Sequence, residues 1–324
     1  MSLPGSLMKD RPDQTALHSP VWRERDDAPV RTPREYVPLF YSRAGAAVPL
    51  EGMYRGGHAF LMAGGPSVKE LDLEPLKRRW VMTLNNGSKT FRGNANCTVD
   101  DPSRFSLSMW MDPTLMKFMP MAHFEKPLWD NRLLHTEAGE VQRWEASRLR
   151  AGDCPNVVGF RRNEKFHASR WLHEETINWG NHGKFGGGRS VLLASLRILY
   201  SLGFRSVYLL GVDFEMSETK RYHFEEQRSA ASIKGNMETY AKLQTWFAEL
   251  QPQFLKSRFI VRNCNPDSRL TAFPHLPYAE ALAESGLRMG DPARERTEGM
   301  YLPLEDKTGG KKQEQPSRPA APTA

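Results

Sequence analysis

The residues best suited to chemistry in this chain lie in four polar turns, each of which follows an apolar run. A glycine pair lets backbone amides approach a phosphate closely, and an asparagine amide can donate to and accept from a base or a ribose. An aspartate can bind a sugar hydroxyl or a metal. The turns are Gly64-Gly65-Pro66-Ser67, Asn85-Asn86-Gly87, Asp100-Asp101-Pro102-Ser103 and Gly211-Val212-Asp213-Phe214.

Two glycine-rich segments could hold phosphate groups. Each leads into a predicted helix, whose positive N-terminal end would attract an anion. A tight strand-to-helix turn explains the first segment equally well, and a hinge explains the second. The residues expected to contact the ligand are Gly64, Gly65, Pro66 and Ser67 in the first segment, and Gly187, Gly188, Arg189 and Ser190 in the second.

Polar residues after the next predicted strands extend this candidate site. Asn85 and Asn86 suit a base or a ribose, although isolated asparagines more often form turns. Asp101 and Ser103 follow the third predicted strand. In a parallel α/β sheet, ligands bind beyond the carboxyl ends of the strands, so we expect these residues at the same site.

His223 and Asp213 are the candidates for catalysis. His223 lies ten residues after Asp213, and an imidazole can take a proton from an acceptor hydroxyl near neutral pH. Asp213 could bind a sugar hydroxyl or a metal, or it could cap the next turn. Arg189 or Lys184 would steady a leaving phosphate. For a histidine with no further context, a structural role is the commoner alternative.

Strand and helix signals alternate around these turns. This alternation predicts a Rossmann-like α/β fold, in which a mainly parallel sheet carries helices on both faces. Ser67 and Glu70 have the spacing of a capping box at the first helix. The predicted strands are 58–63, 80–84, 97–99, 132–135, 157–160, 206–210 and 259–262, and the predicted helices are 69–79, 189–202, 229–250 and 278–285.

We expect a single catalytic domain over residues 36–305. Residues 1–35 are rich in Pro, Asp and Arg and predict a flexible arm, and residues 306–324 predict a disordered basic tail. Residues 105–185 hold many Met and Trp residues and few clean periods. They predict an irregular lid or insertion within the domain.

Composition limits the class of protein. The three cysteines are far apart and form no CxxC pair, which argues against a disulfide framework or a zinc knuckle and favours a reducing, cytoplasmic setting. No apolar run is long enough to span a membrane, and the polar N-terminus does not read as a signal peptide. The net charge of +7 is compatible with a polyanionic partner, and equally with a solvated basic surface.

Three blocks of this sequence resemble segments of a known family. The first is 63–70 followed by Leu84-Asn85-Asn86, the second is 190–214, which ends Gly-Val-Asp-Phe, and the third, weaker block is 262–268. In order and spacing they resemble the bacterial sialyltransferase-like family over residues 58–102 and 186–283. A related group of pterin pyrophosphokinases shares the Gly-Gly-Pro-Ser opening.

The resemblance implies a variant nucleotide-binding fold and a nucleotide-sugar co-substrate, often a CMP-sugar. By analogy, the turn 64–67 and Asn85 would hold the nucleotide. Asp101 stands where the family has an asparagine, and a carboxylate there argues against an anionic sugar such as sialic acid. His223 is assigned as the base by inference, because the family's histidine falls in a segment that this chain largely lacks.

The leading interpretation is a glycosyltransferase acting on a hydroxylated pyrimidine, such as a hydroxymethylated one, in phage-type DNA, in the cytoplasm of the host cell. Basic clusters at 77–79 and 161–162 and the Trp-rich insertion suit a DNA partner. The alternatives are a glycosyltransferase for a surface glycan, a pterin-type pyrophosphokinase and a non-catalytic nucleic-acid-binding protein. The pyrophosphokinase would need Mg²⁺ on carboxylates such as Asp101, Asp213 and Glu215. The sequence leaves metal dependence and oligomeric state open.

Overall fold

The computed structural model describes residues 38–137, 139–162, 167–173, 190–216, 230–286, 298–300 and 302. The chain divides into two compact units at Ser285, and the elements described below all belong to the first unit.

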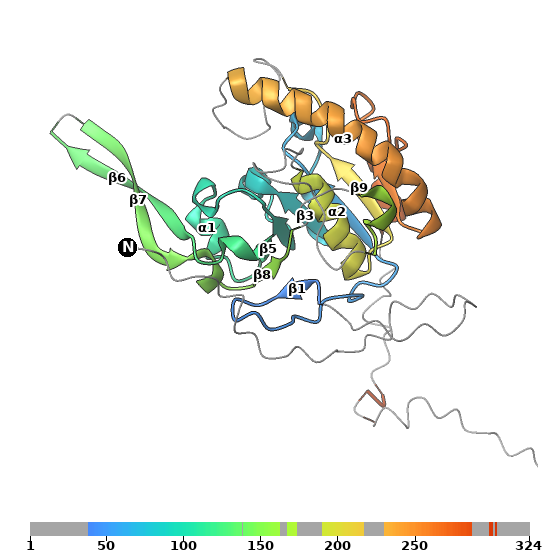
Figure 1. Ribbon diagram of the computed structural model, residues 1–324, viewed down its shortest axis with the longest axis horizontal. Coiled ribbons are helices and arrows are strands. Elements are labelled where there is room, and N and C mark those ends of the chain that lie inside the picture. The colour runs from blue at the N-terminus through green and yellow to red at the C-terminus, as the bar shows by residue number, and fades with distance from the viewer. Residues whose placement is uncertain are drawn as a thin grey trace, which may run out of the picture. The chain divides into compact units, whose positions relative to one another are not determined.

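An eight-stranded sheet forms the centre of this unit (Figure 1). Neighbouring strands run parallel except at one edge, where β1 is antiparallel to β8. This confirms the predicted mainly parallel α/β sheet. In spatial order the strands are β1 (Phe40–Tyr41), β8 (Val157–Phe160), β5 (Met116–Pro120), β4 (Ala95–Cys97), β3 (Val81–Leu84), β2 (His58–Met62), β9 (Ser206–Leu210) and β10 (Ile260–Asn263).

The strand order reverses between β2 and β9. From β2 the chain adds β3, β4 and β5 on one side, and later adds β9 and β10 on the other. Helices α2 (Val191–Leu202) and α3 (Ala230–Lys256) pack on one face of the sheet with side chains such as Leu61 and Val207. On the other face, α4 (Tyr278–Glu284) packs with Phe60 and Tyr208. The sheet is therefore doubly wound, as expected for a Rossmann-like fold.

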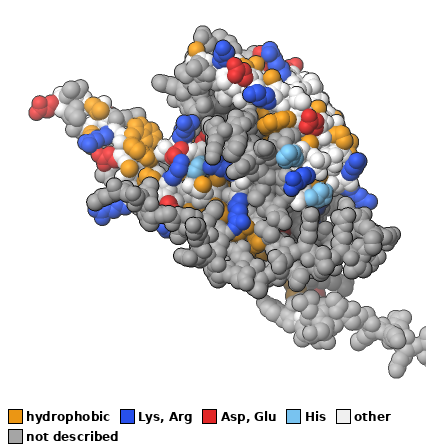
Figure 2. Space-filling model, in the orientation of Figure 1, with side chains coloured by type: hydrophobic (Ala, Val, Ile, Leu, Met, Phe, Trp, Pro, Cys, Tyr) orange, Lys and Arg blue, Asp and Glu red, His pale blue; other side chains and the backbone are white. Residues whose placement is uncertain are grey.

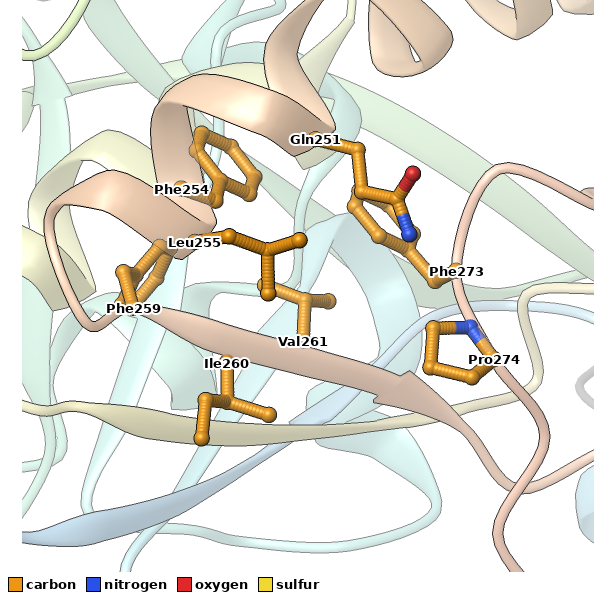
Figure 3. A pocket seen from close by; sticks show the side chains of 8 residues that line it. All are labelled: Gln251, Phe254, Leu255, Phe259, Ile260, Val261, Phe273 and Pro274. Atoms are coloured by element: carbon orange, nitrogen blue, oxygen red, sulfur yellow. The ribbon is translucent and has the colours of Figure 1, made fainter.

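Helix α2 illustrates how local sequence sets an element. Ser190 caps its N-terminus by accepting a hydrogen bond from the Leu193 amide, and Gly203 ends it with a left-handed φ of 103°. The prediction for this helix is confirmed. Helix α3 instead runs six residues beyond its predicted end, through Pro252. Phe254 in this added turn (Figure 3) is 1% exposed and stacks on Phe273, so burial compensates for the proline.

The predicted helix over 69–79 is wrong. Two 3₁₀ turns, Pro66–Glu70 and Glu74–Arg78, occupy this stretch. Each has a proline in its first turn, and the Asp72 carboxylate accepts a hydrogen bond from the Glu74 amide at the break between them. The turn 64–67 is therefore not followed by a continuous α-helix, and the capping role predicted for Ser67 does not occur.

The described part of the region 105–185 is more regular than expected. It contributes two strands, β5 and β8, to the main sheet, and the predicted strand 157–160 is β8 itself. The predicted strand 132–135 lies inside β6 (Pro127–Thr136), which forms a long antiparallel hairpin with β7 (Gly139–Arg150) (Figure 1). A short helix, α1 (Leu107–Trp110), packs near its base.

Strand β5 was not predicted from the sequence, because Lys117 places a cation in the middle of its apolar run. Its side chain is 1% exposed, and its ammonium donates a hydrogen bond of 2.5 Å to the Asp112 carbonyl. Beside it in the sheet, Asn96 and Thr83 are also fully buried. One face of the sheet thus carries a row of polar side chains across β3, β4 and β5.

The buried lysine predicts a pH-dependent stability. Burial lowers the pKa of the Lys117 ammonium from 10.5 to about 8. Above pH 8 the folded state therefore releases a proton that the unfolded chain still holds, so the free energy of unfolding should rise between pH 8 and pH 10.5. We expect urea unfolding of Lys117→Met to lack this rise, whereas the exposed control Lys242→Met keeps it. Identical pH profiles for Lys117→Met and the wild type would contradict the prediction.

Candidate functional site

The loops after β2 and β9 meet at the point where the strand order reverses. The Gly65 amide donates a 2.8 Å hydrogen bond to the Gly211 carbonyl. A Cβ on Gly65 would lie 2.4 Å from that carbonyl oxygen and 2.4 Å from the Asp213 carboxylate. Gly211 itself has a left-handed φ of 63°. Both glycines are therefore required for the close approach of these two loops, which lie where α/β sheets bind their ligands.

Asp213 joins the turn 64–67 to the loop after β10. Its carboxylate accepts hydrogen bonds from the Ser67 amide (3.0 Å), the Ser67 hydroxyl (2.5 Å) and the Asn265 side-chain amide (2.8 Å). The side chain is only 8% exposed. A buried carboxylate with three donors is held in one place, which favours a positioning role for Asp213 over direct contact with a substrate.

The loop after β10 also fixes the backbone around Asp213. The Arg269 amide donates to the Asp213 carbonyl at 2.9 Å, and the Ser268 hydroxyl donates to the Val212 carbonyl at 2.5 Å. Phe214 follows with a positive φ of 55° and stacks on Tyr240. The sequence showed Asn265 only as part of a weakly matching block. The sequence feature that could have identified Asn265 is its position two residues after a strand, since the other polar turns also follow strands.

The turn 64–67 holds few free amides. Gly65 donates to Gly211, Ser67 donates to Asp213, and Pro66 has no N–H. The turn thus forms a rigid wall of the site. A phosphate cradle made by these amides, as the sequence suggested, would require them to exchange partners.

The loop after β3 offers unsatisfied acceptors. Asn85 has a left-handed φ of 51°, and its buried side-chain oxygen has no hydrogen-bond partner among the described residues. Asn96 donates to the Asn85 carbonyl (3.0 Å) and to Thr83 (2.9 Å), which leaves its own side-chain oxygen unpaired in this part of the chain. Asn86 is turned away and donates to the Arg104 carbonyl. Asn85 is therefore better placed than Asn86 to bind a ligand's N–H or O–H group.

Asp101 forms an ion pair that the sequence did not predict. Its carboxylate lies 2.6 Å from the Lys126 ammonium and accepts a 3.1 Å hydrogen bond from the Ser103 amide. Partial burial would raise the pKa of the Asp101 carboxyl, but the bonds from Lys126 and Ser103 outweigh this and lower the pKa to about 2. Lys126 thus compensates the negative charge that argued against an anionic sugar.

Several expected residues lie outside the described part of the chain, including the candidate base His223. Ser190 is described, and it caps α2. The structure thus brings Gly64, Gly65, Pro66 and Ser67 together with Asp213, and puts Asn85 and Asp101 after the adjacent strands β3 and β4. Among the described residues, no group of three or more His, Cys, Asp or Glu residues could hold a metal ion. The expected residues outside the described part are Lys184, Gly187, Gly188, Arg189 and His223.

Comparison with known proteins assigns no family to this chain. No family model and no curated protein matches the chain. One solved structure is similar: the crystal structure of a mammalian sialyltransferase in complex with Gal-beta-1-3GalNAc-ortho-nitrophenol. The similarity has a TM-score of 0.32 and 12% identity, and it covers 64% of this chain and 68% of that chain. None of the helices in the described ranges is long and apolar enough to cross a membrane.

Proposed function

We propose that this chain is a glycosyltransferase that binds a nucleotide-sugar donor beside the junction of β2 and β9. The observation that carries the proposal is the close approach of Gly65 to Gly211 at the reversal of strand order. It is supported there by polar groups from the loops after β2, β3, β9 and β10. Asp213 holds these loops together. A nucleoside N–H or O–H group would satisfy the buried oxygen of Asn85.

The proposed reaction transfers a sugar to a hydroxyl oxygen. His223 takes the hydroxyl proton, and the oxygen forms a bond to the anomeric carbon of the donor sugar. The bond from that carbon to the phosphate oxygen breaks, and the nucleotide leaves with the electron pair. Arg189 or Lys184 would stabilise the charge on the leaving phosphate. Gly187, Gly188 and Ser190 would form the second contact with the donor phosphates.

The proposed acceptor is a hydroxylated pyrimidine in DNA. The hairpin β6–β7 supports an aromatic contact with bases, because Trp129 and Trp144 lie 36% and 54% exposed on it. Apolar side chains of this hairpin are visible as an orange patch in Figure 2. The same tryptophans can stack on sugar rings, so a surface glycan is the second candidate acceptor.

The test incubates the full chain with hydroxymethylated DNA, unmodified DNA and a free oligosaccharide, each with a panel of nucleotide sugars. We expect a mass increase of one sugar on hydroxymethylated DNA alone. An increase on the oligosaccharide alone would favour the glycan. No transfer to any acceptor, with no shift in melting temperature on adding the nucleotide sugars, would overturn the proposed function.

Asn85→Gly should separate ligand binding from folding. Glycine adopts the left-handed backbone of Asn85 without strain, so we expect melting temperature to change little while its increase with nucleotide is lost. The matched control is Asn156→Gly, which removes another left-handed asparagine (φ 53°) that precedes β8. The control should keep the nucleotide response. An unchanged response in Asn85→Gly would exclude this side chain from the site.

A further inference from the structure

Arg161 directly follows β8, and its environment differs from that of other cations near this strand. Its guanidinium carbon lies 4.8 Å from the centre of the Tyr41 ring, a cation–π contact. Its Nε is buried and has no hydrogen-bond partner in the part of the chain that the structure describes. A buried guanidinium N–H without an acceptor is unfavourable unless a ligand supplies one.

No carboxylate among the described residues forms an ion pair with Arg161. Arg43, two residues after Tyr41, forms ion pairs with Glu125 (3.1 Å) and Asp153. Lys126 is likewise paired with Asp101. Among these basic groups, Arg161 is the one with no carboxylate partner in the described residues.

The next residue, Arg162, contacts a buried histidine. Arg162 lies with its guanidinium nitrogen 2.9 Å from Nε2 of His123, which is 7% exposed. Because the guanidinium is the donor, the imidazole nitrogen accepts and carries no proton at that position. This contact with the neutral imidazole of His123 orients the Arg162 side chain next to the end of β8.

These arginines lie on the same edge of the sheet as the donor site. Strand β8 runs parallel to β5, β4, β3 and β2, so its carboxyl end faces the same way. Four strand spacings of about 4.8 Å separate β8 from β2, which is about 19 Å. A donor bound at β2 and β9 would leave the β5–β8 end of this edge to the acceptor.

We propose that Arg161 binds a phosphate group on the acceptor side of the site. A guanidinium stacked on an aromatic ring is held ready for the paired hydrogen bonds that a phosphate accepts. Only the identity of the molecule that carries the phosphate depends on the proposed function. That phosphate belongs either to a nucleic-acid backbone or to a small phosphorylated compound.

The experiment measures binding of a fluorescent eight-nucleotide oligothymidylate to the full chain by anisotropy at several salt concentrations, without donor. Inorganic phosphate serves as a competitor. We expect Arg161→Gln to weaken oligonucleotide binding about tenfold, because a hydrogen bond to a charged group is lost. The slope of log affinity against log salt concentration should become shallower by about one, which corresponds to the loss of one phosphate contact. Arg262→Gln, whose guanidinium is already paired with Glu284 at the opposite end of the sheet, is the matched control and should bind like the wild type.

Competing results identify the source of the phosphate or reject the site. The site is supported if inorganic phosphate competes with the oligonucleotide for the wild type but not for Arg161→Gln. If the oligonucleotide does not bind, but inorganic phosphate raises the melting temperature of the wild type and not of Arg161→Gln, a small phosphorylated compound is the ligand. Equal affinity and salt slope in the wild type and Arg161→Gln would overturn the proposal. Arg161→Lys, which keeps charge, controls for misfolding. Because no donor is present, these results stand apart from any failure of sugar transfer.

Discussion

Asp213→Ala is expected to lose about 3–6 kcal/mol of stability, a large part of the 5–15 kcal/mol typical of a folded domain. The substitution leaves the Ser67 amide, the Ser67 hydroxyl and the Asn265 amide without their common acceptor. These donors are only partly buried, so each one that loses its partner costs about 1–2 kcal/mol, the lower part of the range for a buried donor. Urea unfolding followed by circular dichroism measures this change.

The same substitution should also abolish the effect of nucleotides on melting temperature, because the loops after β2, β9 and β10 lose their common contact. The matched control is Asp267→Asn in the loop after β10. Asp267 is exposed, and the hydrogen bond recorded for it comes from its backbone amide. The control should unfold like the wild type. A stable Asp213→Ala protein that still responds to nucleotides would show that Asp213 positions nothing.

Elements with purely local signals were predicted well. Strand β9 has an uninterrupted apolar run and was predicted residue for residue, and α2 carries both its N-cap Ser190 and its C-terminal Gly203. Strand β5 was missed because Lys117 interrupts its apolar run, and a chain gives no local sign that a lysine will be buried. The helix 69–79 was wrong because prolines at 66 and 75 favour short 3₁₀ turns.

The candidate site was predictable in position but not in detail. Polar residues at the carboxyl ends of parallel strands must share one edge, so grouping the turn 64–67 with Asn85 and Asp213 followed from strand order. The partners of these residues did not. Asp213 bonds Ser67 at a separation of 146 residues and Asn265 at 52, and no local pattern records such pairs. For the same reason the amides expected to cradle a phosphate proved to be used within the protein.

Gly65→Ala tests whether the contact between the β2 and β9 loops is essential. The backbone of Gly65 has a φ of −65° and a ψ of 150°, which any residue can adopt, so only the added methyl group matters. That methyl would meet the Gly211 carbonyl and the Asp213 carboxylate at 2.4 Å, about 1 Å closer than van der Waals contact allows. One of the two loops must move. We expect a loss of about 2–3 kcal/mol and no shift in melting temperature with nucleotide sugars.

Gly235→Ala is the control, and its expected effect on stability is the opposite of that of Gly65→Ala. Gly235 lies in α3, and a Cβ there meets nothing within 4 Å, so alanine should stabilise the helix by about 0.5–1 kcal/mol. The nucleotide response should remain. A Gly65→Ala protein that is as stable as the wild type would mean that the loops tolerate separation. If it also kept the nucleotide response, the donor would not bind against these loops. If only the response were lost, the close approach of Gly65 would serve the ligand and not the fold.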